Sequence, residues 1–439
     1  MIRGPEATLA TAYALLDSTQ WLSPSEIEAQ QGRQLEAVVA YAARFSPQFS
    51  RRLNAAGVLP SEFNSKASLR RLPELSRRDL QNAGDSFYCT EVPEDHRPIG
   101  ITQTSGSTGE PVTVRRTFIN QLLWLASTLR EHAWHSNDFT GRLSAIRANI
   151  PDYVESADWG PPASHLHATG KSQAIPIIWD IGRQFETLQR FGPNILVIYP
   201  NTLSALCDYV EQNARTLPEL GMIKTVGETL PRALRTRAAE LFRARVVDSY
   251  SSQELGVLAV QCPLSELYHV CAETHLVEIL DTAGVPCKAG EIGRVVVTDL
   301  HNFASPLIRY AIGDYAEVAG TPCRCGRGLP SLARILGRER NLVLMPDGTR
   351  HWPLTGFARF LEIAPIHQYQ FIQHTRTAIE VRLVLSTELS GTQETALTAL
   401  IQSALGYPFE LRYTFFPEWL PAPNGKFEEF VCKVKDLTS

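Results

Sequence analysis

The stretch that decides the fold is TSGSTGEPV, residues 104–112, which lies between two apolar segments. Its two glycines have no β-carbon, so successive backbone N–H groups can point into one concavity and bind an anion. A plain surface turn has a similar composition, and the spacing differs from that of a Walker A loop. We interpret the stretch as a phosphate loop whose candidate ligands are Thr104, Ser105, Gly106, Ser107, Thr108 and Gly109.

Five further motifs follow this stretch along the chain. They are GETL at 227–230, DSYSSQE at 248–254, IRYAIGD at 308–314, GR at 337–338 and PNGK at 423–426. In this order the motifs resemble those of the acyl-adenylate-forming superfamily, whose members join carboxylic acids to AMP and then usually to a thiol. The chain is most similar to the phenylacetate–CoA ligase family within it, because that family's helical amino-terminal segment is also matched. The resemblance covers nearly the whole chain.

Composition narrows the class of protein. The 439 residues are 44% hydrophobic, which is enough for a large core in two or three domains. The net charge of -4, without a long basic block, argues against nucleic acid as a partner. The sequence shows neither a signal peptide nor an apolar run long enough to cross a membrane. We therefore expect a cytoplasmic protein with reduced cysteines and a small-molecule ligand.

Strand and helix patterns alternate in the middle of the chain and predict a parallel sheet with covering helices. The expected strands are 194–199, 222–226 and 246–247, and the expected helices are 202–213 and 231–244. Residues 150–179, rich in Gly, Pro, Ser and His, have a composition typical of long functional loops. The fold class expected is α/β, a large adenylate-forming amino-terminal domain of several subdomains with parallel sheet layers.

Other sequence patterns divide the chain into a helical amino-terminal segment, an antiparallel subdomain and a small carboxy-terminal domain. Residues 25–60 have helical spacing, which in the resembled family belongs to a segment that helps build a homodimer. Residues 276–280 and 295–300 predict an antiparallel subdomain. Beyond residue 340 the composition shifts to a small α+β domain. We expect domains at 1–340 and 341–439, with a hinge at Arg340 and Asn341.

The resemblance also implies roles for individual residues. Lys426 would be the catalytic lysine that neutralises charge when a carboxylate attacks the α-phosphate of ATP. Glu254 would hold Mg²⁺ at the carboxyl end of a strand. The remaining residues would contact ATP or AMP. Tyr250 would lie against the adenine, with Ser251 next to it at the nucleotide, and Glu228 and Thr229 would border the adenine. Asp314 would bind the ribose, and Arg338 the ribose or a phosphate.

Two departures from the family pattern affect the chemistry expected. Glu110 stands where the family commonly has lysine, and a carboxylate aimed at a triphosphate would be repelled, so it either points outward or weakens pyrophosphate binding. Arg340 or Asn341 stands where the family's hinge usually has aspartate, and PDGT at 346–349 predicts a hairpin turn. These departures leave more than one acyl acceptor open, namely CoA or alternatively a carrier protein or an amine. A third interpretation of the sequence is a non-catalytic protein that binds an aromatic metabolite.

Four residues form a candidate zinc site. Cys262 and His269 precede Cys323 and Cys325 on the other side of the antiparallel strands, and Cys271 is an alternative ligand. Three thiolates and an imidazole complete a tetrahedral shell, and a closed shell of four protein ligands is typical of structural zinc. Zinc-bearing relatives of the resembled family match this pattern.

We predict that Lys426→Ala abolishes adenylation while ATP affinity and folding stay nearly unchanged, because the lysine interacts with charge that develops in the transition state. Pyrophosphate release measures the first step, and transfer from a supplied acyl adenylate to a thiol, which should persist, is the control. Adenylate formation at the wild-type rate would show that this residue has no such role.

Overall fold

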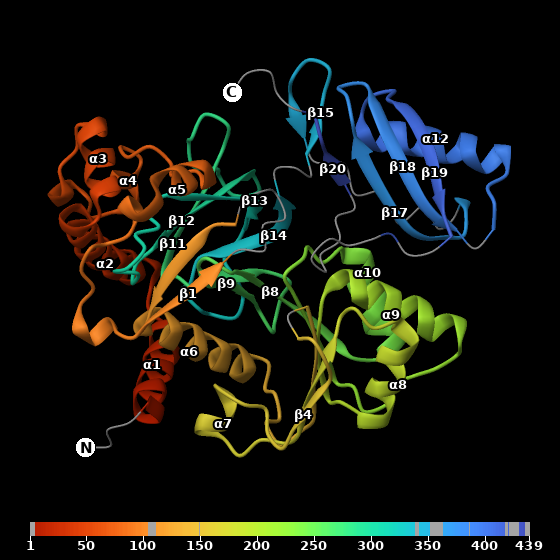
Figure 1. The fold of residues 1–439 in the computed structure, drawn as a ribbon, viewed down its shortest axis with the longest axis horizontal. Helices are drawn as coiled ribbons and strands as arrows, with labels where there is room; N and C mark the ends of the chain where they lie inside the picture. Colours follow the sequence, from red (N-terminus) through yellow and green to blue (C-terminus); the bar gives the residue numbers. More distant parts are fainter. Residues whose placement is uncertain are drawn as a thin grey trace.

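A computed structural model describes residues 5–434 except for 104–110, 149, 339–341, 352–362, 386, 418–419 and 421–429. We call the described residues up to 338 the large lobe and those from 342 onward the small lobe. Figure 1 shows the amino-terminal helices at one end of the large lobe and the small lobe beside helices α9 and α10.

Twelve strands of the described residues form one sheet in the large lobe, in the order β11-β12-β13-β14-β10-β9-β8-β7-β6-β3-β5-β4. Five neighbouring strands are parallel, from β8 to β5. The bounds are β3 Leu143–Arg147, β4 Val154–Ser156, β5 Ser172–Pro176, β6 Ile195–Ile198, β7 Met222–Val226, β8 Arg245–Ser252, β9 Gly256–Gln261, β10 Tyr268–Val270, β11 His275–Leu280, β12 Ile292–Asp299, β13 Tyr310–Val318 and β14 Ser331–Arg338.

The alternation expected in the middle of the chain is confirmed. Strands β6, β7 and β8 alternate with α9 (Pro200–Gln212) and α10 (Arg232–Phe242), and α8 (Ile181–Phe191) precedes them. The three helices lie together beside the parallel strands in Figure 1. Buried apolar side chains such as Phe185, Leu206 and Ile223 fill the space between helices and sheet. Burial of both faces explains why these strands are nearly continuous apolar runs.

The antiparallel strands predicted from residues 276–280 and 295–300 are also confirmed, as β11 and β12. They are continuous with the parallel strands rather than a separate sheet, because β8 pairs with β7 on one side and with β9, antiparallel, on the other. This pairing satisfies the backbone groups along both edges of β8.

The expectation of long loops at residues 150–179 is wrong in part. Strands β4 and β5 and the short helix α7 (Ala163–Leu166) lie there. Strand β5 pairs with β3 in parallel and buries Gln173 and Ile175. Gln173 is satisfied by the Ser144 hydroxyl, so this polar residue is stable inside the sheet.

The amino-terminal helices pack against the antiparallel strands around Leu35, Phe49 and Leu276. Ser76 and Asp79 form a capping box that fixes the start of α5. The bounds are α1 Pro5–Thr19, α2 Pro24–Phe45, α3 Pro47–Ala56, α4 Lys66–Leu69, α5 Arg77–Ala83 and α6 Phe118–Trp134, with single 3₁₀ turns at Pro60–Glu62, Gly84–Phe87 and Glu94–His96. Strands β1 (Ile99–Gln103) and β2 (Thr113–Thr117) form a hairpin before α6. No helix of the described residues is both long and apolar enough to span a membrane.

The small lobe has the predicted α+β character. Its four-stranded sheet has the order β19-β18-β17-β20, and the hairpin β15–β16 contains the turn predicted at residues 346–349. The bounds are β15 Val343–Leu344, β16 Arg350–His351, β17 Ile366–Gln373, β18 Ala378–Leu385, α12 Gly391–Leu405, β19 Glu410–Phe416 and β20 Phe430–Cys432. Phe371, Ile401 and Phe409 belong to its own buried core. The domain boundary expected at residues 340 and 341 lies outside the described residues.

Arg309 connects the amino-terminal segment to the sheet. Its guanidinium forms a buried ion pair with Glu278 of β11, with 3.1 Å between Nε and Oε2, and donates to the Leu72 carbonyl at 2.6 Å. Its own carbonyl accepts from Leu75 N–H at 2.8 Å, in a left-handed backbone conformation with φ of 56°. Arg309 therefore has a structural role, although it lies within the IRYAIGD motif.

We predict that Arg309→Met lowers the free energy of unfolding by about 3–5 kcal/mol, because Glu278 would keep a buried charge without a partner. Urea unfolding followed by circular dichroism measures the change. The control is Arg334→Met, which removes the exposed pair with Glu317 and should cost at most about 1 kcal/mol. Equal losses in the two variants would contradict the structural role.

Candidate functional site

Two of the predicted motifs, GETL and DSYSSQE, lie beside the start of α9 at one edge of the large sheet. Asn201, Glu228 and Glu254 follow the carboxyl ends of β6, β7 and β8, which are parallel neighbours. Ligands of open α/β sheets bind outside the carboxyl ends of the strands. The Glu228 carboxylate accepts the Asn201 backbone N–H at 2.9 Å, so the turn after β7 is fixed to the start of α9.

Tyr250, Asp314 and Arg338 form the best-defined part of the site. Asp314 of β13 and Arg338 of β14 are cross-strand partners, with 3.7 Å between Oδ1 and Nε. The Tyr250 hydroxyl donates to the other carboxylate oxygen of Asp314 at 2.8 Å. The structure thus brings together three residues that are 64 and 24 positions apart in sequence, and it orients the Asp314 carboxylate from two sides.

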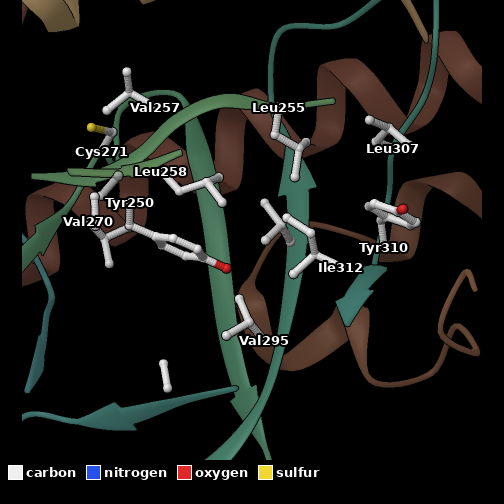
Figure 2. Close-up of a cluster of buried hydrophobic side chains, with 14 of the residues drawn as sticks. Tyr250, Leu255, Val257, Leu258, Val270, Cys271, Val295, Leu307, Tyr310 and Ile312 are labelled. Atoms are coloured by element: carbon white, nitrogen blue, oxygen red, sulfur yellow. The ribbon is translucent and has the colours of Figure 1, made fainter. Parts of the chain in front are cut away.

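Tyr250 lies within strand β8 and not in the turn that follows it. Its ring belongs to a buried cluster that includes Leu258 and Ile312, and Figure 2 shows the hydroxyl at the far end of the ring. Burial, and next the charge of Asp314, raise the pKa of Tyr250 well above its ordinary value. The hydroxyl therefore stays protonated and remains a hydrogen-bond donor.

Thr229 approaches the same place from the turn after β7. A β-carbon added to Gly337 would lie 2.8 Å from the Thr229 hydroxyl, and Gly337 has a φ of 93°. Both facts require glycine before Arg338. The predicted adenine-bordering turn therefore lies directly beside the end of β14, whereas Ser251 continues β8 next to Tyr250.

Arg77 is a member of the site that sequence reasoning missed. Its Nη1 atom lies 3.8 Å from the Glu254 carboxylate, which is 6% exposed. Helix α5 reaches this place because Leu75, just before it, forms backbone hydrogen bonds with Arg309 and Ala311 beside strand β13. The serine cap predicts where α5 begins, but nothing in the local sequence indicates that its first residue faces Glu254.

Arg116 supports the same turn from the other side. Its guanidinium donates to the Gln253 carbonyl and stacks over the Trp124 ring, 4.4 Å from the ring centre. Arg115 contacts Asp85 and stacks over Tyr88 instead. Glu110 lies outside the described residues.

A second buried network fixes β8 on its other face. Glu131 of α6 accepts from both Lys224 of β7 and Ser249 of β8. Burial raises the pKa of Glu131, but Lys224 and the hydrogen bonds outweigh it and lower the pKa overall. Glu131 is therefore ionised, and it holds the residue next to Tyr250 in place.

Several predicted residues cannot be placed. The phosphate loop residues 104–109, the hinge residues Arg340 and Asn341, and Lys426 lie outside the described residues. The hairpin nevertheless places both ends of the loop, since Gln103 and Thr113 are paired.

The four residues of the predicted metal site do come together. One ligand atom from each of Cys262, His269, Cys323 and Cys325 lies within 4.8 Å of all the others. The sulfur atoms of Cys262 and Cys323 are 3.5 Å apart, and Cys325 Sγ is 3.2 Å from His269 Nε2. Zn–S bonds of about 2.3 Å in a tetrahedron place two sulfur atoms about 3.8 Å apart, so the set fits zinc. Cys271 lies outside this group and is not needed for it.

Hydrogen bonds around these side chains favour metal binding. His269 Nδ1 lies 3.3 Å from the Leu329 carbonyl, which leaves Nε2 facing the cysteines. Burial lowers the pKa of His269 to about 4, so the imidazole is neutral. Burial raises the pKa of Cys323, but hydrogen bonds from Ser265 and from backbone N–H outweigh it. A neutral imidazole is the form in which histidine binds a metal ion, and the lowered pKa of Cys323 favours the thiolate that zinc requires.

The comparison with known families decides the assignment. The sequence profile described as AMP-binding enzyme matches residues 34–304, more than half of the chain. The chain belongs to the AMP-binding enzyme family. This AMP-binding enzyme is 26% identical over 363 residues to a phenylacetate–coenzyme A ligase of Thermus thermophilus, a match that covers 79% of this chain and 78% of the relative.

Solved structures confirm the fold. A 2-hydroxyisobutyryl-CoA ligase in the postadenylation state, in complex with R3-HIB-AMP, superposes with a TM-score of 0.75 at 18% identity, covering 94% of this chain and 90% of that one. The same ligase in the thioesterification state, with 2-HIB-AMP and CoA, superposes with a TM-score of 0.61 at 20% identity, covering 93% and 90%. The α/β fold class expected from the sequence, with its large and small sheets, is therefore confirmed.

We predict that Asp314→Asn weakens ATP binding about 10- to 100-fold, because a charge-assisted hydrogen bond to the ribose is worth about 1.5–3 kcal/mol. Isothermal titration calorimetry measures the affinity. Glu317→Gln, on the same strand but paired with Arg334 at the surface, is the matched control and should bind ATP normally. An unchanged affinity in Asp314→Asn would exclude this carboxylate as a nucleotide ligand.

Proposed function

We propose that the protein is an AMP-forming acid–CoA ligase that activates a carboxylic acid, of the aryl or arylacetic class, with ATP and Mg²⁺. The reaction has two steps. A carboxylate oxygen attacks the α-phosphorus of ATP and the bond to the β-phosphate breaks, which releases pyrophosphate and leaves an acyl adenylate. The CoA thiol, having lost its proton, then attacks the acyl carbon and AMP leaves.

The observation that carries this proposal is the group formed by Tyr250, Asp314 and Arg338 at the carboxyl edge of the parallel strands. A carboxylate held on two sides is able to accept from two vicinal hydroxyl groups, as a ribose offers, and Arg338 brings a positive charge to the adjacent phosphate. Glu228 and Thr229 border the same place. Membership of the AMP-binding enzyme family, whose profile matches residues 34–304, supports a nucleotide as the ligand of this group.

The chain's own residues divide the chemistry between them. Glu254 fits Mg²⁺, because it is a carboxylate at the ligand-binding edge and one protein oxygen is sufficient beside phosphate oxygens. Mg²⁺ would supply charge neutralisation at the phosphates. Arg77 lies beside Glu254 and adds positive charge there, in a chain whose phosphate loop has Glu110 in place of lysine. Lys426 would neutralise the charge that develops at the α-phosphate.

Two other functions are the alternatives. The departures from the family pattern at Arg340 and Asn341, where the sequence predicts the hinge, favour a carrier-protein thiol or an amine as an alternative acceptor. The same pocket without turnover would make a binding protein for an aromatic metabolite. The resemblance also predicts a homodimer.

The test is pyrophosphate release from ATP with a panel of aromatic acids, followed by thioester formation when CoA is added. We expect release with at least one aryl or arylacetic acid and a CoA thioester as product. Release without a CoA thioester, but with acyl transfer to a carrier protein or an amine, would favour the alternative acceptor. Binding of ATP and acid without release in the whole panel would favour the binding protein. Asp314→Asn, which we expect to bind ATP about 10- to 100-fold more weakly, is the control that ties the release to this site.

We also propose that Cys262, His269, Cys323 and Cys325 hold a structural zinc ion. The distances among the four ligand atoms and the donors around them support this assignment. A shell of four protein ligands leaves no open position for a substrate, so the ion would stabilise the fold near the antiparallel strands rather than take part in the reaction.

We predict that Cys323→Ser releases zinc and lowers the melting temperature by about 5 °C or more, because zinc binding contributes directly to folding. Metal analysis of the purified protein and differential scanning calorimetry measure the two effects. Cys432→Ser, in the small lobe, is the matched control and should keep the zinc. Wild-type protein prepared without chelator that contains only a trace of zinc would contradict the site.

A further inference from the structure

The two lobes meet through a glutamine that is almost completely buried. Gln368 of β17 is 6% exposed although it carries an uncharged polar amide. Its Nε2 atom donates to Asn201 Oδ1, in the large lobe, at 3.2 Å. Its Oε1 atom accepts from the Leu420 backbone N–H, in the small lobe, at 2.6 Å. Both polar atoms of the amide are therefore used, one on each side of the lobe boundary.

The large-lobe end of this contact leads directly to the nucleotide site. Asn201 lies in the first turn of α9, and its backbone N–H donates to the Glu228 carboxylate. Glu228 lies in the turn that also positions Thr229 beside Arg338. A hydrogen-bonded path thus connects Gln368 to the residues proposed to border the adenine.

The small-lobe end of the contact lies, in the sequence, shortly before the proposed catalytic lysine. Leu420 is buried and precedes Lys426 by six residues. Since Gln368 fixes the Leu420 backbone, it fixes the point from which the segment that carries Lys426 starts. Residues 421–429 themselves lie outside the described residues.

A second observation places β17 against the same helix. His367, the neighbour of Gln368, lies close enough to Asp208 to influence its pKa, which burial raises and which Arg237 and His367 partly lower. Asp208 is seven residues after Asn201, so both lie on one face of α9. The pairing of β17 with β18 is irregular between Ile366 and Gln368, and such a bulge re-aims the side chains of a strand.

We propose that the contact between Asn201 and Gln368 holds the small lobe in the arrangement used for adenylation, so that both are positioning residues for Lys426. The comparison with the 2-hydroxyisobutyryl-CoA ligase supports this arrangement. The chain superposes with a TM-score of 0.75 on the postadenylation state and of 0.61 on the thioesterification state of that one ligase. The contact belongs to the first state and must break when the small lobe turns for the second. The expected effect on reaction rates rests on the proposed function, whereas the expected effect on the position of the small lobe does not.

The test uses two variants of the full-length protein. Gln368→Met fills the same volume but removes both hydrogen bonds, whereas Asn201→Ala removes only the bond between the lobes. We expect pyrophosphate release to fall about tenfold in each, with the Michaelis constant for ATP nearly unchanged. Thioester formation from a supplied acyl adenylate and CoA should stay within about twofold of wild type, because that step does not use the contact.

Controls separate positioning from stability. Gln402→Met removes a glutamine whose side chain bonds the Phe409 carbonyl within the small lobe, and it should affect neither step. The double variant with Asn201→Ala and Gln368→Met should be no slower than Gln368→Met alone, since the two residues act through one contact. Equal falls in both steps, or no fall in pyrophosphate release, in folded variants would overturn the proposal.

A structural measurement keeps this inference separate from the proposed function. Small-angle X-ray scattering of wild-type protein should fit the structure with its lobes in contact, whereas Gln368→Met should fit worse and have a larger radius of gyration. Identical scattering from the two proteins would overturn the contact as a determinant of lobe position, even if the wild type releases no pyrophosphate. Wild-type protein without pyrophosphate release would overturn the proposed function alone.

Discussion

The structure depends above all on strand β8, which pairs with β7 in parallel and with β9 in antiparallel fashion. Through these pairings one sheet contains both the parallel strands, whose carboxyl ends provide the ligand-binding edge, and the antiparallel strands, which carry Asp314 and Arg338. The turn between β8 and β9 holds Glu254. Because backbone hydrogen bonds fix both sides of β8, the Tyr250 hydroxyl has one position relative to Asp314.

The buried charges of the large lobe support this edge rather than simply adding stability. Arg309 with Glu278, and Lys224 with Glu131, are ion pairs almost without access to water. Such pairs add little net stability compared with apolar residues but are costly to break. The first fixes the segment that brings Arg77 to Glu254, and the second fixes Ser249 beside Tyr250. Both therefore limit how far the site can rearrange.

The two proposed metal ions have different relations to the fold. The zinc ligands come from the end of β9, from β10 and from the loop between β13 and β14, so one ion would join three segments of the antiparallel region. The proposed Mg²⁺ ligand would be a single carboxylate, that of Glu254, beside Arg77. A closed shell suits a permanent structural ion, whereas a single carboxylate suits an ion that arrives with the phosphates of ATP.

The sequence by itself determined the alternation of strands and helices from β6 to β8, the antiparallel pair β11 and β12, the α+β small lobe and the four side chains of the candidate metal site. These features have local signals, namely apolar periodicity, turn residues and the spacing of cysteine and histidine. The motifs also indicated Tyr250, Glu254, Asp314 and Arg338. Only the tertiary structure decided which of these residues touch one another, since pairs such as Tyr250 and Asp314 meet through strand pairing across the sheet.

Other features had no local signal at all. Arg77 reaches Glu254 because Leu75 bonds to the backbone beside β13, and Gln368 reaches Asn201 because two lobes dock. Strand β5 lies in a segment rich in glycine, proline and histidine, and the sequence did not predict it as a strand. Its burial depends on pairing with β3 rather than on a periodic pattern of apolar residues. An arginine or a glutamine in a sequence looks the same whether solvent or another lobe surrounds it. The physical reason is that the periodicity of apolar residues indicates only the secondary structure of a segment and its buried face, whereas these contacts depend on where distant segments lie in space.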